Sequence, residues 1–317
     1  MRICFSMDPP RECASGGGVR FVIGFEKFLK SKGHEVIFSL DYKNLPDMLF
    51  MFDPRYLNFS KNNITIDHVR SIRQNKLPVK IIHRMNDIGP PKGRPMNYVS
   101  NMLELANYSD AVVYVSNFVK DYFSEKGNIT TNNSVIYNGV DKKTFFPKDK
   151  YSLEKIKLVT HHWSTNKIKG WDFYKKIDNW IENKNIDFTI IGNIPNDIDF
   201  KNTNIVKPIT GKELSEKIKE SNIYITASQY EPCGNHYLEG VACGLPLLYH
   251  SQGGGVLDMN EFGEEYDNLN SFKQKLELIK NNYDMYHKRI INNFNFYHDV
   301  VFEKYYKVIL GSYNDRP

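Results

Sequence analysis

The chain is poor in the residues that build disulfide-stabilised and metal-stabilised proteins. Its 317 residues include four cysteines, which are Cys4, Cys13, Cys233 and Cys243. Their spacing matches no zinc motif, and a disulfide-rich secreted scaffold is excluded. The adjacent His161 and His162 have no cysteine or carboxylate close by in the sequence, so a zinc site is not favoured there either. The simplest interpretation is a protein with free thiols in a reducing compartment.

Long apolar runs are also missing. No stretch of 18 apolar residues occurs, so no transmembrane helix is expected. Residues 1–8 lack the apolar centre of a signal peptide and are interpreted as part of a first strand. A cytoplasmic location is therefore expected. The hydrophobic content of 41% and charged content of 25% are ordinary for a globular protein, and the length suits two domains.

Acidic residues are scarcer in the first half than in the second. Residues 1–150 carry 22 basic and 15 acidic side chains, whereas residues 151–317 carry 20 and 22. The basic half could meet an anionic acceptor or, peripherally, an anionic membrane surface, although a lysine-rich solvated surface would look the same. No zinc-finger, basic-zipper or single-strand-binding pattern is present, so no nucleic-acid partner is expected.

Short apolar runs alternate with longer amphipathic ones throughout the chain. The predicted strands are at residues 2–5, 35–38, 48–51, 79–82, 111–115, 134–137, 158–160, 188–191, 205–206, 223–225 and 247–249. The predicted helices are at residues 19–31, 97–108, 171–183, 211–220, 270–281 and 286–311. This alternation predicts an α/β protein with two parallel sheets covered by helices. A charged stretch at residues 142–155 is the predicted hinge.

The most informative segment is residues 231–246, which read EPCGNHYLEGVACGLP. Pro232 and Gly234 predict a loop, and a short helix follows that Gly244 ends. A loop entering a helix N-terminus offers backbone N–H groups and a positive dipole to a phosphate. Glu231 and Glu239 flank this place, and carboxylates accept hydrogen bonds well from sugar hydroxyls. The combination indicates a nucleotide-sugar site, against the simpler alternative of two solvated carboxylates.

The segment resembles the donor-binding signature of retaining GT-B glycosyltransferases, in particular glycosyltransferase family 4. The resemblance implies two Rossmann-like parallel-sheet domains facing a central cleft. Residues 1–148 would be the acceptor domain and residues 149–290 the nucleotide-sugar donor domain, with a helix in residues 291–317 that could cross back to the first. It implies that Glu231 contacts the transferred sugar and Glu239 the ribose.

Two further segments carry the resemblance. Residues 138–141, with the sequence NGVD, are similar to the family's interdomain segment. Lys169 before Gly170 matches the lysine that neutralises the diphosphate in the family. The arginine expected five residues earlier is replaced by Ser164, which is a departure from the pattern. Lys167, His162 or Arg20 could compensate for the missing charge.

Several other residues receive roles from the same resemblance. Gly16, Gly17, Gly18 and Arg20 follow the first strand and would approach the donor phosphates, although a glycine loop alone is also compatible with a structural turn or, with Asp41, a nicotinamide site. The remaining donor-binding residues implied by the resemblance are Ser164, Thr210, Cys233, Gly234, Asn235 and His236.

Two residues of the first half are predicted to contribute to catalysis. His83 is predicted at the carboxyl end of a strand, where side chains of α/β folds meet ligands. The resemblance implies that it contacts the transferred sugar. Asp87 follows it and could orient the acceptor hydroxyl. A satisfied buried histidine and a turn-capping aspartate are the simpler alternatives. The Asp197–Asp199 pair resembles a metal motif of another architecture but is interpreted as solvated.

The resemblance implies a retaining, metal-independent glycosyltransferase. It would move a hexosyl unit from a nucleotide diphosphate sugar, with UDP or GDP as the expected nucleotide and no other cofactor, to a hydroxyl of a glycan, a lipid or a protein-linked sugar. Alternatives are a catalytically degenerate nucleotide-sugar-binding or scaffold protein, a nicotinamide-dependent enzyme, and a sugar-nucleotide epimerase or phosphorylase.

Overall fold

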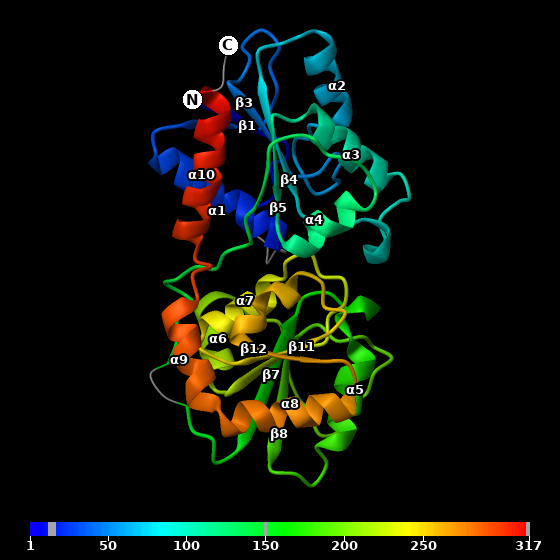
Figure 1. Ribbon diagram of the computed structural model, residues 1–317, viewed down its shortest axis with the longest axis vertical. Helices are drawn as coiled ribbons and strands as arrows, with labels where there is room; N and C mark the ends of the chain where they lie inside the picture. Colours follow the sequence, from blue (N-terminus) through cyan, green and yellow to red (C-terminus); the bar gives the residue numbers. More distant parts are fainter. Residues whose placement is uncertain (12–16, 149–150, 315–317) are drawn as a thin grey trace. The chain divides into compact units, whose positions relative to one another are not determined.

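The structure is a computed structural model that describes residues 1–11, 17–148 and 151–314. The chain forms two compact units, which Figure 1 shows as ribbons. The first unit contains residues 1–138 and 298–317, and the second contains residues 139–297. The divisions therefore follow Asn138 and Tyr297, whereas the sequence placed them after residues 148 and 290.

The first unit is built on a six-stranded parallel sheet with strand order β2-β1-β3-β4-β5-β6. Its strands are β1 (Arg2–Phe5), β2 (Glu35–Ile37), β3 (Met48–Met51), β4 (Lys80–Met85), β5 (Ala111–Tyr114) and β6 (Asn133–Val135). Its helices are α1 (Gly17–Ser31), α2 (Ile66–Gln74), η1 (Pro90–Lys92), α3 (Tyr98–Tyr108), α4 (Asn117–Ser124) and α10 (His298–Asn314). The sequence reasoning did not identify α2 or α4.

Apolar residues fill both faces of this sheet. One cluster joins Phe5 and Phe50 of the strands to Phe25 of α1 and Phe302 of α10, and Figure 1 shows these two helices side by side. A second cluster, on the other face, packs strand residues such as Ile81 against α2. The middle strands are buried on both faces, which is why they read as continuous apolar runs.

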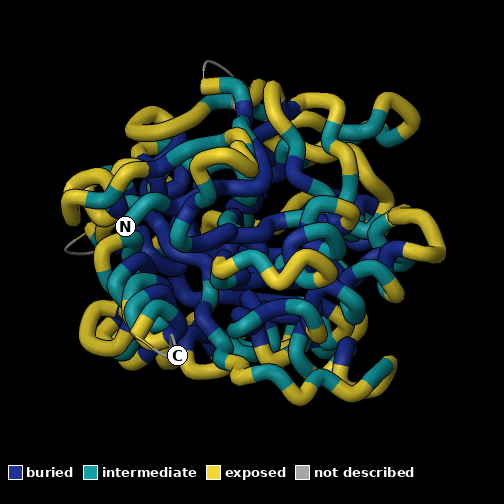
Figure 2. Tube along the Cα trace, turned by 90° about the horizontal axis from the view of Figure 1, so that it is seen from above, coloured by how far each residue is buried: buried dark blue, intermediate teal, exposed yellow. Residues whose placement is uncertain are grey.

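The second unit has strand order β12-β11-β10-β7-β8-β9, again all parallel. Its strands are β7 (Ile156–His162), β8 (Ile186–Gly192), β9 (Asn204–Val206), β10 (Ile223–Thr226), β11 (Leu247–His250) and β12 (Gly263–Tyr266). Its helices are η2 (Lys167–Lys169), α5 (Trp171–Trp180), α6 (Gly211–Lys219), α7 (Asn235–Ala242), η3 (Gly255–Phe262), α8 (Leu269–Asn281) and α9 (Tyr283–Asn293). Most residues of these strands are buried, and Figure 2 draws the buried residues of the chain in dark blue.

The strand order of the second unit fixes where a ligand is expected. Numbered within the unit, its strands run 3-2-1-4-5-6, so the chain changes direction between β7 and β10. In open parallel sheets, ligands bind beyond the carboxyl ends of the two strands at such a switch point. A ligand-binding site is therefore expected at the segments that follow β7 and β10.

Two predictions about local structure were wrong. The helix predicted at residues 286–311 is divided into α9 and α10, because Phe294 is extended and the next residues pair with another segment: the N–H of Val140 donates to the carbonyl of Phe296 at 2.9 Å. The strand predicted at residues 158–160 continues to His162, so both histidines lie in β7 rather than in a loop. In the described parts of the chain, no helix has the length and apolar character needed to cross a membrane.

Candidate functional site

The segment after β7 carries Lys169 in the short helix η2. Gly170 ends this helix with φ of 81°, a conformation that favours glycine, and a Cβ there would lie 2.2 Å from the carbonyl oxygen of Ala227. The N–H of Gln229 donates to the carbonyl of Ile168 at 2.7 Å. These contacts hold η2 against the carboxyl end of β10, so Lys169 is placed at the switch point.

The segment after β10 carries Glu231. Its backbone pairs with the loop before η3: the N–H of Glu231 donates to the carbonyl of Gly253 at 3.1 Å, and the N–H of Gly255 donates to the carbonyl of Glu231 at 2.7 Å. Tyr230, immediately before it, is held in the left-handed region with φ of 52°, which costs a non-glycine residue energy. The backbone around Glu231 is thus fixed from both sides.

Lys169 and Glu231 form an ion pair between Nζ and Oε2. The lysine side chain is 14% exposed and the glutamate side chain 10%, so both charges are largely shielded from water. Charges in such a place interact more strongly than at an open surface, and they are held where a ligand could meet them. The sequence predicted each residue separately but did not predict their pairing.

Helix α7 begins next to this pair. Its N-cap residue is Gly234, which has no side chain to cap the helix, and Asn235 is the first helical residue. Cys233 and His236 are buried, and Asn235 is half-buried. The positive end of the α7 dipole therefore lies four residues after Glu231 in the chain, and a helix N-terminus of this kind can bind an anion.

Between α7 and the sheet lies a buried network of histidine side chains and hydroxyl groups. His161 Nε2 lies 2.8 Å from Glu239 Oε2, and His161 Nδ1 lies 3.0 Å from the hydroxyl of Tyr224. His162 Nε2 lies 2.8 Å from the hydroxyl of Tyr174. Burial, with the charge of the nearby His236 and Lys169, holds the pKa of His162 well below its ordinary value. The His162 ring is therefore neutral near pH 7 and cannot replace the missing arginine charge.

Other predicted donor residues of the second unit lie at the surface. Ser164 is exposed, and its Oγ accepts a hydrogen bond from the N–H of Asn166 at 3.2 Å, as a turn residue does. Thr210 is exposed and precedes α6 as its N-cap residue. Lys167 is also exposed, two residues before Lys169 in η2. The donor-binding roles of Ser164 and Thr210 stay predictions.

In the first unit, the glycine loop is only partly described. Gly16 lies outside the described residues, whereas Gly17 and Gly18 are the first residues of α1 and Arg20 is half-buried in the same helix. Loop and helix start follow β1, which adjoins β3 at the switch point of this sheet. Contact with donor phosphates stays a prediction for these residues.

His83 lies within β4 rather than at its end, opposite Met51 and Val112 in the neighbouring strands. Its side chain is fully buried, and neither ring nitrogen has a hydrogen-bond partner. Burial lowers the pKa of His83 to about 3, so the ring is neutral. Both simple expectations therefore differ from the structure: the residue is neither at a strand end nor a satisfied histidine, and its contact with a sugar stays a prediction.

Asp87 follows β4 and is engaged by its own loop. Its carboxylate accepts from the N–H of Gly89 at 3.1 Å and from Nε of Arg94 at 2.8 Å. This is the turn-capping alternative seen in the sequence. An acceptor hydroxyl would have to share the carboxylate with Arg94.

Sequence reasoning missed the buried residues that hydrogen-bond to one another next to the candidate site. Tyr224 is in a short apolar strand and carried no motif signal, and His161 was treated only as a weak metal candidate. In the first unit it also missed Arg84, a buried guanidinium whose Nε donates to the Tyr305 hydroxyl at 3.1 Å and whose Nη2 donates to Asn138 Oδ1 at 2.6 Å. Among the described residues no cluster of three or more histidine, cysteine or carboxylate side chains could hold a metal ion.

Comparison of the sequence with descriptions of protein families finds no match, and comparison with curated protein sequences finds none either. Solved structures do match. Sucrose-phosphate synthase of Thermosynechococcus elongatus has a TM-score of 0.74 at 12% identity, over 99% of this chain and 100% of that one. HepE of Anabaena in complex with UDP has a TM-score of 0.71 at 13% identity, over 98% and 100%. A glycosyltransferase of Rickettsia africae has a TM-score of 0.69 at 17% identity, over 99% of both chains.

These likenesses establish the fold. The two six-stranded parallel sheets with their helices are those of GT-B glycosyltransferases, as the sequence predicted. At identities of 12–17%, the likeness establishes the fold alone.

Proposed function

We propose that the protein is a retaining glycosyltransferase of family 4 type that transfers a hexosyl unit from a nucleotide diphosphate sugar to an acceptor hydroxyl. The observation that carries the proposal is the shielded Lys169–Glu231 pair beside the N-terminus of α7. One cation and one helix dipole suit a diphosphate, and the carboxylate beside them suits the hydroxyl groups of a sugar. Glu239, inside the same helix, is assigned to the ribose.

The chemistry follows from where charge develops. Breaking the glycosidic bond leaves negative charge on the β-phosphate and positive character on the sugar ring. Lys169 and the backbone N–H groups at the start of α7 would stabilise the phosphate, because they are fixed before the reaction begins. Glu231 would orient the sugar through its hydroxyl groups. The departing phosphate would assist removal of the acceptor proton, so the proposed mechanism uses neither a protein nucleophile nor a metal ion.

The nucleotide is proposed to be UDP or GDP, and the acceptor a glycan, a lipid or a protein-linked sugar. HepE of Anabaena supports UDP in particular, since its structures were obtained with UDP and with UDP-glucose. The degenerate-scaffold alternative is favoured by one observation, the exposed Ser164 in place of the expected arginine. Turnover separates these two possibilities, whereas binding alone does not.

The experiment is a thermal-shift and hydrolysis panel of UDP-sugars, GDP-sugars and NAD(P), with and without EDTA. Glu231→Gln keeps the size of the side chain, and Glu213→Gln makes the same change at an exposed position of α6. We expect one nucleotide sugar to raise the melting temperature. We also expect its slow hydrolysis to persist in EDTA and in Glu213→Gln but to fall at least about a hundredfold in Glu231→Gln.

The other outcomes are equally informative. Binding of a nucleotide sugar without turnover, even with candidate acceptors, identifies a scaffold protein. Stabilisation by NAD(P) alone contradicts the proposal. For an active protein, NMR of the product with a defined acceptor tests retention, because the anomeric configuration must equal that of the donor.

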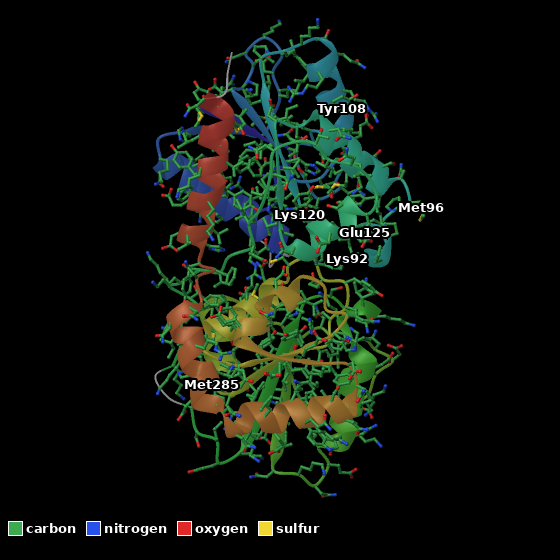
Figure 3. All side chains as sticks on the ribbon, viewed as in Figure 1. Lys92, Met96, Tyr108, Lys120, Glu125 and Met285 are labelled. Carbon is green, nitrogen blue, oxygen red and sulfur yellow. The ribbon has the colours of Figure 1, made fainter. Side chains whose placement is uncertain are left out.

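Peripheral contact with an anionic membrane is proposed for the first unit. Tyr56 is 70% exposed, Phe59 50% and Met96 82%, and Figure 3 labels Met96 and the basic Lys92 in the segment between β4 and α3. Exposed apolar side chains combined with cations suit an anionic lipid surface. Co-sedimentation with vesicles containing phosphatidylglycerol, but not with pure phosphatidylcholine vesicles, is the expected result.

A further inference from the structure

Glu239 is a carboxylate that the fold has removed from water. It lies in α7 and is 1% exposed. Burying an ionised carboxylate is costly unless it is paired and hydrogen-bonded. The ring of His161 supplies a partner, since its Nε2 lies 2.8 Å from Glu239 Oε2 and each of the two side chains is only 2% exposed. This contact joins the end of β7 to the helix that carries the proposed nucleotide site.

The contacts with Glu239 and Tyr224 determine which ring nitrogen of His161 carries the proton. That hydroxyl accepts the backbone N–H of His161 at 3.1 Å and lies 3.0 Å from Nδ1 of the same residue. An ionised carboxylate only accepts hydrogen bonds, so the contact with Glu239 requires the proton on Nε2, and the Tyr224 hydroxyl then donates its own proton to Nδ1. Nδ1 is then an acceptor and Nε2–H is the donor that faces Glu239.

Packing prevents Tyr224 from leaving this position. Its side chain is fully buried in β10, and its ring lies against the backbone of α7 at Gly240. A Cβ at position 240 would lie 2.1 Å from Cδ2 of Tyr224. The strand, the tyrosine, the histidine and the helix are therefore joined by packing and hydrogen bonds, and these contacts set the direction of the Glu239 carboxylate.

We infer that His161, held by Tyr224, is a positioning residue that orients the Glu239 carboxylate toward the ribose diol and so makes the site select ribonucleotides over 2′-deoxyribonucleotides. The inference rests on the proposed function, which assigns Glu239 to the ribose. A carboxylate with one oxygen held by His161 cannot turn to suit a ligand that lacks a hydroxyl. A site that hydrogen-bonds a hydroxyl group binds the analogue without it more weakly, because a hydrogen bond to a charged group is then lost.

The competing explanation is that His161 only fastens α7 to the sheet. In that case the loss of His161 would weaken the binding of every nucleotide by the same factor. Orientation of Glu239, by contrast, predicts that the loss falls on the ribose hydroxyl alone. The ratio of two affinities separates the explanations even if the variants are less stable than the wild type.

The test uses the full chain and measures dissociation constants for UDP, GDP and their 2′-deoxy forms by calorimetry. The variants are His161→Leu, which removes the donor, His161→Gln, whose amide can replace Nε2–H, and Tyr224→Phe, which keeps the ring. The matched control is His287→Gln. That histidine is also buried in the second unit and bonds the carbonyl of Gly244, beyond the far end of α7.

For the nucleotide that the wild type binds, we expect a preference of at least about tenfold for the ribose form, the value of one hydrogen bond to a charged group. His161→Leu should lose this preference, because only the binding of the ribose nucleotide should become weaker. His161→Gln should restore most of it, Tyr224→Phe should lie between, and His287→Gln should leave the ratio unchanged.

An unchanged ratio in folded His161→Leu, or equal weakening of both forms, overturns the inference. If His161→Leu does not fold, an unchanged ratio in both His161→Gln and Tyr224→Phe overturns it instead. Binding of ribose and deoxyribose forms with equal strength by the wild type overturns it while leaving the proposed function intact. A wild type that binds neither nucleotide overturns the proposed function and, with it, this inference.

Discussion

The two units share a parallel six-stranded architecture but fill it with different chemistry. In the first unit, the face beneath α1 and α10 is packed with aromatic rings, among them Phe5, Phe25 and Phe50. In the second, the space beneath α7 holds hydrogen-bonded groups such as His161 and Tyr224. Aromatic packing stabilises mainly through buried area and tolerates several ring geometries, whereas a hydrogen bond orients a particular donor and acceptor atom. The second interior is thus the one suited to positioning charged groups.

Two buried histidines, one in a strand of each unit, differ in the same way. His83 in β4 has no partner for either nitrogen, and burial lowers its pKa to about 3. His161 in β7 is bonded through both nitrogens. The first is neutral and unpaired, so a sugar hydroxyl could satisfy it only after a local opening. The second already has Glu239 as a hydrogen-bond partner.

The largest effect on the comparison is expected from Phe25→Ala in the first unit. The side chain is fully buried and packs against six aromatic rings, three of which belong to Phe21, Phe302 and Tyr305. Its removal should lower the free energy of unfolding by ~3–5 kcal/mol in denaturant titration. Phe59→Ala, at a half-exposed position, should change it by less than about 0.5 kcal/mol. Equal effects of the two changes would show that the aromatic cluster is not the stabilising core.

The next effect concerns turnover rather than stability. Lys169→Met should reduce donor turnover about 10²-fold to 10³-fold, because the proposed mechanism uses this fixed cation to stabilise the departing phosphate. Steady-state kinetics with the nucleotide sugar selected by the hydrolysis panel is the measurement. Lys176→Met, at an exposed position of α5, is the control and should leave turnover unchanged. A loss of stability without a loss of turnover in Lys169→Met would assign the ion pair a structural role.

A third effect depends on pH. Burial would raise the pKa of Asp178, but the hydrogen bonds from Lys175 Nζ and the N–H groups of Lys201 and Asn202 lower it to about 2. The carboxylate therefore stabilises the second unit above its ordinary pKa near ~4, and this stabilisation disappears as the pH falls toward 2.

Asp178→Asn tests that expectation. It should lower the free energy of unfolding by about 1–2 kcal/mol at pH 7 and by much less at pH 2. Denaturant titration at several pH values measures this, and Asp172→Asn, exposed on the same helix, should show no such dependence. Parallel pH profiles for the wild type and Asp178→Asn would contradict the assignment.

The smallest effect is expected from Tyr305→Phe, which removes a buried hydroxyl group from the aromatic core of the first unit. The hydroxyl accepts from Nε of Arg84 at 3.1 Å and lies 3.3 Å from the carbonyl oxygen of Ile136. Its removal leaves a buried guanidinium with one partner fewer and should cost ~1–2 kcal/mol of unfolding free energy. Tyr42→Phe, half-exposed, should be neutral. A neutral Tyr305→Phe would mean that ring packing alone holds α10.

Much of the fold could be predicted because parallel strands buried on both faces read as apolar runs between amphipathic helices. The loop and helix start around Glu231 could be predicted for a similar reason, because glycine and proline are local requirements of such a segment. Lys169 and Gly170 were identified by resemblance to a family pattern, and the roles of Glu231 and Lys169 stay predictions. What could not be predicted depends on residues far apart in the chain. Nothing near Tyr224 in the sequence indicates that its hydroxyl serves His161, 63 positions earlier.

The extent of β7 shows the same limit. A strand that ends in two histidines breaks the expected apolar pattern, so the sequence placed its end before them. Only the pairing with β8, which continues to His162 opposite Gly192, and the partners available on α5 and α7 make these polar residues acceptable in the interior.

The contact between Tyr224 and Gly240 has an evolutionary consequence. Because the ring occupies the volume that a side chain at position 240 would need, neither residue can change freely while the other stays. Descendants of this chain should therefore keep both or exchange them together, a smaller residue on the strand accompanying a larger one on the helix. Such a coordinated exchange would be visible as covariation between two positions that no local motif connects.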